Sequence, residues 1–257
     1  MMIALHQFRL VNGINISPFC LKVETYLRLA RLPYRVVDDL PFKGPKGKLP
    51  FIVDDDGRTI ADSGDIIAYL EATGPRPLDA DLSPQRRAIA HLVTRTMEES
   101  TYFAAVYDRW LIDANWPRLR AVMRADLPAA LRWIVPILIR RKIRRDLLGQ
   151  GYGRHTAPQV YARGAADIAA VAAALGDSPF LGGDQPASAD ASLYAFLVGL
   201  LDAGFDGPLT DAARAQPNLL AYHQRMAAHL AAIGLYRSAV DMTCRRRRGG
   251  PASQSGA

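Results

Sequence analysis

The sequence of 257 residues is poor in cysteine and contains no long apolar run. Its two cysteines, Cys20 and Cys244, cannot build a disulfide framework, which favours a reducing compartment where a thiol stays free. No stretch approaches the roughly 20 apolar residues that span a bilayer. Residues 1–6 lack the basic flank and the small-residue cleavage site of a secretion signal. These absences predict a globular, cytoplasmic protein.

The excess of positive charge is smaller than the total suggests. The formal net charge is +7, but residues 245–248 are all arginine and precede a stretch rich in glycine and serine. Removing those four charges lowers +7 to +3, and no aromatic residues alternate with basic ones as in a stacking platform for bases. The composition argues against a nucleic-acid partner, and residues 239–257 are predicted to be a disordered basic tail.

The first 74 residues carry alternating strand and helix signals. A strand, a helix and a strand in this order predict parallel strands joined by a right-handed crossover. In the helix, Phe19, Val23 and Leu27 recur on one face, so Lys22 and Arg28 are predicted to face water. The predicted elements are a strand at 3–8, a helix from Pro18, a strand at 34–38, a hairpin of 51–53 and 58–61 across Asp-Gly, and a helix at 64–71.

Beyond a proline-rich linker at residues 75–82, the strand signals stop. The chain is therefore predicted to have an α/β domain over residues 1–74 and an all-helical domain over residues 83–238. An apolar period near 3.6 predicts helical regions at 84–111, 119–148, 160–175, 189–201 and 219–232, the second interrupted by Pro128 and Pro136.

Residues 131–145 form a basic, amphipathic segment. Trp133 and several aliphatic residues stand among six cationic residues, which include Arg140, Arg141 and Lys142. Helices of this composition lie on anionic membrane surfaces. A solvated basic helix has the same pattern, so the sequence leaves both interpretations open.

A hydroxyl, a proline and a thiol meet where the first strand pattern gives way to the first helix. Ser17 suits the N-cap position, Pro18 suits the first helical position, and Cys20 falls in the first turn. Free N–H groups and the helix dipole at that turn favour a thiolate. A well-capped structural helix has the same residues, so the turn alone does not establish catalysis.

Three short motifs together resemble the glutathione transferase superfamily: residues 17–20, residues 48–50 and residues 62–63. Longer blocks resemble more narrowly the branch that contains failed-axon-connections proteins and metaxins. The resemblance implies a thioredoxin-like α/β N-terminal domain, an all-α C-terminal domain, glutathione as co-substrate, no metal, and a homodimer. The blocks are Ser17-Pro18-Phe19-Cys20-Leu21-Lys22-Val23, residues 44–52, Ile60-Ala61-Asp62-Ser63, and residues 149–155.

The resemblance also implies a glutathione-binding role for five residues. Pro50 matches a proline that is cis in this fold and exposes the backbone of Leu49 to the cysteinyl segment of glutathione. Ser63 and the helix start would bind the γ-glutamyl carboxylate, and Asp62 would face its ammonium group. Lys48 would meet the glycyl carboxylate, although a solvated lysine in such a loop is equally typical.

Ser17 is the residue implied to stabilise the glutathione thiolate, by donating a hydrogen bond to its sulfur. Cys20 offers an alternative, a mixed disulfide with glutathione. The predicted function is a transferase that conjugates glutathione to a small electrophile. The alternatives are a non-catalytic adaptor that uses the basic segment for membrane or protein partners, and a glutathione-dependent disulfide reductase using Cys20. The predicted second-substrate pocket consists of Tyr102, Tyr107, Arg109 and Trp110.

Overall fold

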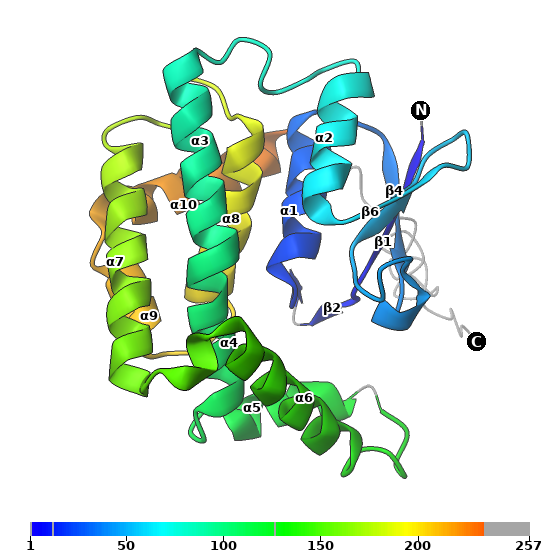
Figure 1. The fold of residues 1–257 in the computed structure, drawn as a ribbon. Helices are drawn as coiled ribbons and strands as arrows, with labels where there is room; N and C mark the ends of the chain where they lie inside the picture. Colours follow the sequence, from blue (N-terminus) through cyan, green and yellow to red (C-terminus); the bar gives the residue numbers. More distant parts are fainter. Residues whose placement is uncertain (1, 12, 126, 234–257) are drawn as a thin grey trace, which may run out of the picture.

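The computed structural model describes residues 2–11, 13–125 and 127–233. The predicted tail, 239–257, and the last residues of the predicted helical domain, to residue 238, lie outside the described residues. Within them, a small sheet with two helices stands beside a larger helical body (Figure 1). No helix in the described ranges has the length and apolar character needed to cross a membrane.

The N-terminal sheet has the strand order β4-β1-β5-β6. β1 (Ile3–Gln7) lies parallel to β4 (Tyr34–Asp38), which confirms the predicted crossover. β5 (Phe51–Val53) is antiparallel to β1 and forms the predicted hairpin with β6 (Thr59–Ala61). Helices α1 (Pro18–Leu29) and α2 (Ser63–Thr73) cover the face of the sheet that looks toward the helical body (Figure 1). The loops hold a short hairpin, β2 (Leu10–Val11) with β3 (Ile14–Asn15), and a 3-10 turn, η1 (Pro41–Lys43).

The helical body confirms most of the predicted helices. The predicted region 119–148 is interrupted as expected and consists of two helices. Pro128 lies in the connection, whereas Pro136 stands in the first turn of the second helix, where proline is tolerated. The elements are α3 (Pro84–Thr96), the π-helical segment η2 (Met97–Thr101), α4 (Tyr102–Leu111), α5 (Trp116–Ala125), α6 (Val135–Gln150), η3 (Tyr152–Arg154), α7 (Ala157–Leu175), α8 (Ser188–Leu201), α9 (Pro208–Arg214) and α10 (Pro217–Ala232).

The two parts of the molecule meet where α1 packs against α8. α8 is buried along most of its length, so its apolar residues occur all round the helix rather than on one stripe. α1 therefore has covered surfaces on two sides, the sheet on one and α8 on the other (Figure 1). A residue on the side of α1 away from the sheet is thus placed between the domains rather than in water.

Asp190 fixes the start of α8. Its carboxylate accepts backbone N–H groups of Leu181 at 2.9 Å, Gly182 at 3.2 Å and Ala187 at 2.8 Å, and the hydroxyl of Tyr222 at 3.0 Å. Burial raises the pKa of this carboxyl, while the four donors act in the opposite direction. A fully buried carboxylate with this many partners anchors the loop before α8 and thereby the position of the helix.

Candidate functional site

The predicted turn lies at the N-terminus of α1. Ser17 is the N-cap, with its Oγ accepting the N–H of Cys20 at 3.4 Å, and Pro18 occupies the first helical turn, so both local predictions are confirmed. The N–H of Ser17 donates to Oδ1 of Asn15 at 3.0 Å, and the side chain of Ser17 is half-buried. A defined turn thus holds a hydroxyl that stays partly accessible.

Cys20 is fully buried, at 0% exposure, in contact with Leu49 and Phe51. Burial raises the pKa of its thiol to about 11, although hydrogen bonds from the Phe8 backbone and the Ser17 side chain oppose the shift. Desolvation is the largest cause of this shift, so the structure does not favour the thiolate that the position of Cys20 at the helix start suggested.

Cys20 is expected to resist alkylation in the folded protein. At about pH 8, a pKa of about 11 leaves roughly one thiol in a thousand ionised. The measurement is intact mass after iodoacetamide treatment of a Cys244→Ser variant, native and in denaturant. Rapid native labelling, at the rate seen in denaturant, would contradict the structure here and restore the disulfide chemistry.

The second motif meets the first around this cysteine. The peptide bond between Leu49 and Pro50 is cis, as the resemblance implied. Both residues are buried, and Ala61, which precedes Asp62, packs on the same small cluster of Cys20, Leu49 and Phe51. The three motifs, which lie far apart in the sequence, are thus gathered around one apolar cluster.

Lys48 is exposed, and its role at a glycyl carboxylate stays a prediction. Another lysine of the same loop, Lys46, reaches α2 and forms an ion pair there: its Nζ lies 2.8 Å from Oδ2 of Asp65. Both side chains of that pair are more than half exposed, at 56% and 65%. The pair is solvent-screened and holds the loop only weakly against the start of α2.

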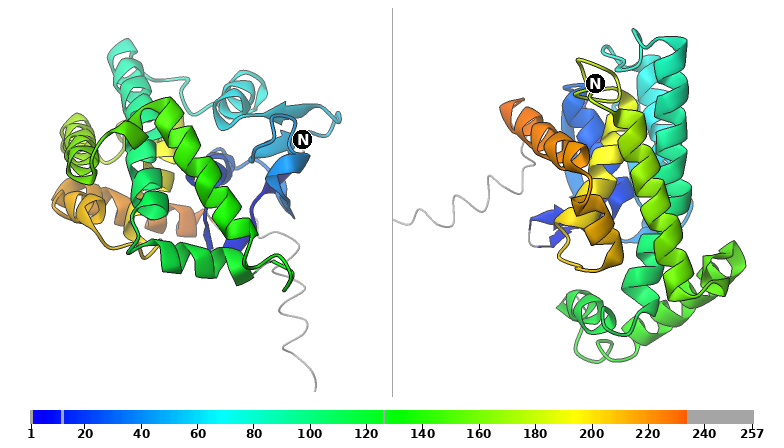
Figure 2. Two further views of the ribbon diagram at one scale, coloured as in Figure 1. Left: turned by 60° about the horizontal axis from the view of Figure 1, so that its bottom comes forward. Right: turned by 90° about the vertical axis from the view of Figure 1, so that its left-hand side faces the viewer.

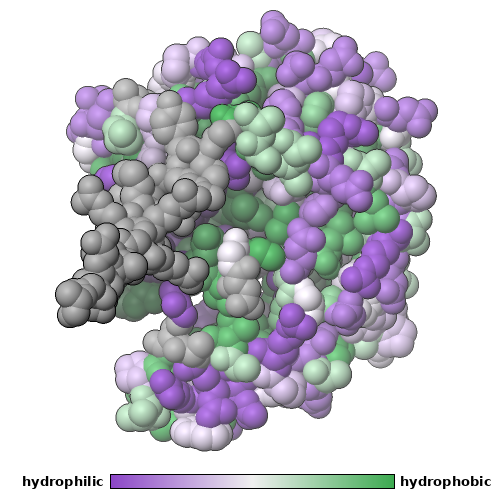
Figure 3. Space-filling model, turned by 180° about the vertical axis from the view of Figure 1, so that it is seen from behind, coloured by the Kyte–Doolittle hydropathy of each residue, from purple (hydrophilic) through white to green (hydrophobic). Residues whose placement is uncertain are grey.

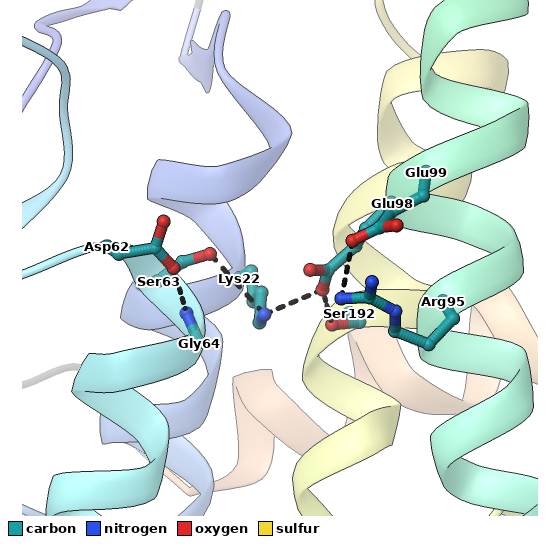
Figure 4. A network of polar contacts seen from close by, with 8 residues as sticks. All are labelled: Lys22, Asp62, Ser63, Gly64, Arg95, Glu98, Glu99 and Ser192. Carbon is teal, nitrogen blue, oxygen red and sulfur yellow. Dashed lines mark hydrogen bonds and ion pairs between the residues drawn. The ribbon is translucent and has the colours of Figure 1, made fainter.

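The third motif forms the start of α2. Asp62 is an exposed N-cap whose Oδ1 accepts the N–H of Gly64 at 2.9 Å, and its backbone has a φ of +90°, rare for a residue with a side chain. Ser63 is only 5% exposed, and its Oγ accepts a hydrogen bond from Nζ of Lys22 at 3.4 Å. The Ser63 hydroxyl thus lies on the side of α2 that faces Lys22 (Figure 4), and its contact with a ligand carboxylate stays a prediction.

Lys22 lies at the centre of a buried network that joins the two domains (Figure 4). Its side chain is 4% exposed and pairs with Oε1 of Glu98 at 2.6 Å, and the hydroxyl of Ser192 donates to the same oxygen at 2.5 Å. The four side chains come from α1, α2, η2 and α8. The expectation that Lys22 faces water is wrong, because the helical body covers that side of α1.

The acid of this pair comes from the π-helical segment. A π-turn inserts an extra residue into a helix and re-aims the side chains around it, often at functional sites. Here Glu98 points toward α1, whereas the neighbouring Glu99 pairs with Arg95 outside the interface (Figure 4). The hydroxyl of Ser100 forms a hydrogen bond with the hydroxyl of Tyr152 at 2.7 Å. This contact packs η3, within residues 149–155, against the same π-helical turn.

Two of the four predicted pocket residues line a cavity beside α1. Tyr102 and Arg109 lie with Pro18 and Phe196 around a space of about 20 Å³, room for about one water molecule. Arg109 donates to the carbonyl of Gly199 at 2.5 Å. The ring of Tyr102 meets those of Phe19 and Phe196 edge-on, at 4.9 and 6.1 Å between centroids. The cavity is small, and the aromatic side chains of Tyr102 and Phe196 are part of its lining.

Tyr107 and Trp110 do not line this cavity, and their place in a second-substrate pocket stays a prediction. The hydroxyl of Tyr107 donates to the carbonyl of His155 at 3.4 Å, and Trp110 lies 6.3 Å from the ring of Trp116. The helical repeat places residues 102, 105, 106 and 109 on one face of α4, and residues 107 and 110 fall outside it.

Among the described residues, Asp54, Asp55 and Asp56 approach closely enough to share a cation. The Asp54 carboxylate is already engaged: it accepts the hydroxyl of Tyr69 at 2.6 Å and the N–H groups of Asp56 and Arg58. The hydrogen bond from Tyr69 is the main cause that lowers the pKa of Asp54. These hydrogen bonds account for the place of Asp54 in the turn.

The fold and the gathered motifs define a two-domain protein with a thioredoxin-like sheet and a helical body. Family models described as glutathione S-transferase N-terminal domain and glutathione S-transferase, C-terminal domain match residues 18–115 and 164–226. The isoprene-epoxide glutathione S-transferase of a Rhodococcus species is 36% identical over 82% of this chain and 92% of its own. The chain belongs to the glutathione S-transferase family.

Other relatives belong to the branch that the sequence motifs indicated. The Failed axon connections protein of Drosophila melanogaster is 32% identical over 82% of this chain, which spans 54% of that protein. Metaxin-2 of Homo sapiens is 24% identical over 81% of this chain and 80% of its own. Among solved structures, a β-etherase from a Sphingobium species shares the fold, with a TM-score of 0.63 and 19% identity over 96% of this chain and 100% of its own. The relatives of this chain thus include a protein whose name denotes an enzyme and proteins whose names do not.

Proposed function

We propose that the protein joins the thiolate of glutathione to a small electrophile, with Ser17 as the donor to the thiolate. The proposal rests on the arrangement of the three motifs, which lie together around the apolar cluster of Cys20, Leu49 and Ala61. The half-buried hydroxyl of Ser17 lies beside this cluster. A free thiol ionises above neutrality. A hydroxyl donor and the N-terminus of α1 both favour the anion and so raise the thiolate fraction at cellular pH.

The start of α2 would hold the γ-glutamyl end of glutathione. This end carries a carboxylate and an ammonium group, and Asp62 offers an exposed carboxylate for the ammonium. The N-terminal turn of α2 carries partial positive charge for the carboxylate. Lys22, held behind Ser63, adds a cation to the same corner, so its role would be to orient Ser63 rather than to touch the ligand.

An epoxide is the electrophile class proposed for the cavity, since the relative at 36% identity is named for one. The sulfur would attack a ring carbon while the carbon–oxygen bond breaks, and the resulting alkoxide would take a proton from water. Tyr102 lines the cavity next to Pro18, where its hydroxyl would donate a hydrogen bond to the developing oxyanion. Entry of an acceptor requires the rings of Phe19, Tyr102 and Phe196 to separate, because the closed space is too small.

A non-catalytic adaptor is the second candidate. The closed cavity of about 20 Å³ and the kinship with metaxins and Failed axon connections favour it. A disulfide reductase using Cys20 has less support, because the thiol is buried and its pKa is raised. A homodimer is proposed for either function from the family alone.

Retention on immobilised glutathione is expected for the wild-type protein and expected to be lost in Asp62→Ala. Losing a charge-assisted hydrogen bond weakens binding by about 10-fold or more. Ser63→Ala is expected to act more weakly, because the Ser63 hydroxyl faces Lys22. Asp65→Ala is the matched control, since Asp65 is exposed on the same helix and pairs with Lys46. If the wild type were not retained, the transferase and reductase proposals would both be abandoned and the adaptor would remain.

A further inference from the structure

Exposed apolar side chains are concentrated at one end of the α5–α6 hairpin. Of the twelve large apolar residues that are exposed in the described part of the chain, five lie within residues 131–138, called the apolar tip here. Burying such side chains is favourable, and a contiguous exposed group marks a surface that meets an apolar phase or a partner. The tip consists of Leu131 (45% exposed), Trp133 (63%), Ile134 (58%), Ile137 (45%) and Leu138 (53%).

The inner face of α6 is fixed to the rest of the helical body. Pro136 and Leu147 are its buried residues. Arg140 donates to the carbonyls of Trp110 at 2.7 Å and Leu111 at 3.2 Å, and its guanidinium pairs with Asp113 at 2.7 Å. Arg140 is therefore a structural residue, which corrects its predicted place on the membrane-facing side. With this face held, the exposed side of α6 is presented outward, and no other helix of the described residues lies over it (Figure 2, left).

The outward face of α6 is basic. Arg141, Arg144 and Arg145 are exposed and form no ion pair with any described residue, whereas Lys142 is neutralised by Asp146 at 2.6 Å. Spacings of three and four place Ile137, Arg141, Arg144, Arg145 and Leu148 on one helical face. The three arginines thus follow the apolar tip along one side of the molecule.

The exposed arginines of α6 and the apolar tip together indicate which kind of partner this surface binds. Figure 3, seen from behind, shows hydrophobic side chains next to hydrophilic ones on the lower lobe, where α5 and α6 lie. Interfacial helices combine aromatic and aliphatic residues that enter the headgroup boundary with cations that bind anionic lipids. We propose that the apolar tip and the row Arg141, Arg144 and Arg145 dock on an anionic membrane surface.

The orientation follows from this assignment. Trp133, the most exposed member of the tip, enters the boundary between headgroups and acyl chains, a position that indole rings favour. The guanidinium of Arg124 lies 3.5 Å from the centre of the Trp133 ring, which brings a further cation to the contact. The three arginines lie along α6 over the lipid phosphates. The contact is peripheral and reversible.

The test is co-sedimentation of the full chain with vesicles of phosphatidylcholine, with and without phosphatidylserine. Wild-type protein is expected to bind only the anionic vesicles, with a blue shift of tryptophan emission that Trp133→Phe removes. The triple variant Arg141→Gln, Arg144→Gln, Arg145→Gln is expected to bind on the order of 10²-fold more weakly, at about fivefold for each arginine. The matched control is Arg35→Gln, Arg76→Gln, Arg163→Gln, which removes three exposed arginines elsewhere and is expected to bind as wild type.

A second variant separates lipid from protein partners. Ile137→Ser with Leu138→Ser is expected to weaken vesicle binding, while retaining the wild-type melting temperature, because both side chains are exposed. Equal binding to vesicles without phosphatidylserine, or a triple variant that binds as wild type, would overturn the proposal. So would a dimer in light scattering that this double variant turns into a monomer, because the tip would then be covered by a second copy. None of these readouts depends on glutathione binding or turnover.

Discussion

Replacing Lys22 by methionine is expected to lower the free energy of unfolding by about 3–5 kcal/mol, the cost of leaving one charge of a buried pair without its partner. Glu98 would keep the hydrogen bond from Ser192, but a side chain that is only 14% exposed would have lost its cation at 2.6 Å. The network joins α1 and α2 of the N-terminal domain to η2 and α8 of the helical domain, so its loss is expected to weaken the contact between the two domains.

The measurement is urea unfolding followed by circular dichroism, with a double-mutant cycle. Lys22→Met combined with Glu98→Gln removes both charges and is expected to recover most of the lost free energy of unfolding. Burying a neutral amide costs far less free energy than burying an unpaired carboxylate. Lys46→Met is the matched control: it breaks an exposed pair and is expected to leave the unfolding midpoint unchanged. A Lys22→Met variant as stable as this control would show that the pair does not hold the domains together.

The N-terminal fold was predictable because its signals are local. The Asp-Gly hairpin, the cap at Ser17 and the strand at Tyr34–Asp38 each depend on a few neighbouring residues, and the structure confirms them. The three motifs could be linked only through family resemblance, since nothing in their spacing shows that Cys20, Leu49 and Ala61 touch.

The sequence-based predictions are wrong where a segment that is distant in the sequence determines whether a side chain is buried. Lys22 lies off the apolar stripe of α1, so periodicity places it in water, yet α8 and η2 cover that side. The shift in helical phase at Met97–Thr101 has no periodic signature, so Pro84 to Leu111 read as one continuous α-helix. Within α4, the helical repeat separates Tyr107 from Tyr102 and Arg109, so these residues do not line one cavity together.

Ser17→Ala is expected to lower the rate of glutathione conjugation by about 10²-fold or more, the usual effect of losing one donor to a developing or bound anion. The loss should fall on kcat and kcat/KM together, because the hydrogen bond acts on the sulfur rather than on the γ-glutamyl end. The assay is conjugation of a small epoxide, with the pH dependence of kcat/KM recorded for each variant. Since the donor stabilises the thiolate, removing it raises the pKa of the bound thiol, so the profile is expected to shift to higher pH.

The alanine variant also removes a helix cap, so a second substitution must separate the two roles of Ser17. Ser17→Asp keeps an acceptor for the N–H of Cys20, and aspartate caps a helix as well as serine does. Its carboxylate cannot donate to sulfur at neutral pH and repels a thiolate, so the variant is expected to be as stable as wild type and inactive. Ser17→Thr keeps both the cap and the donor and is expected to stay active. If Ser17→Ala conjugated glutathione at the wild-type rate, the thiolate would owe its stability to the α1 N-terminus alone, and Ser17 would be a structural cap.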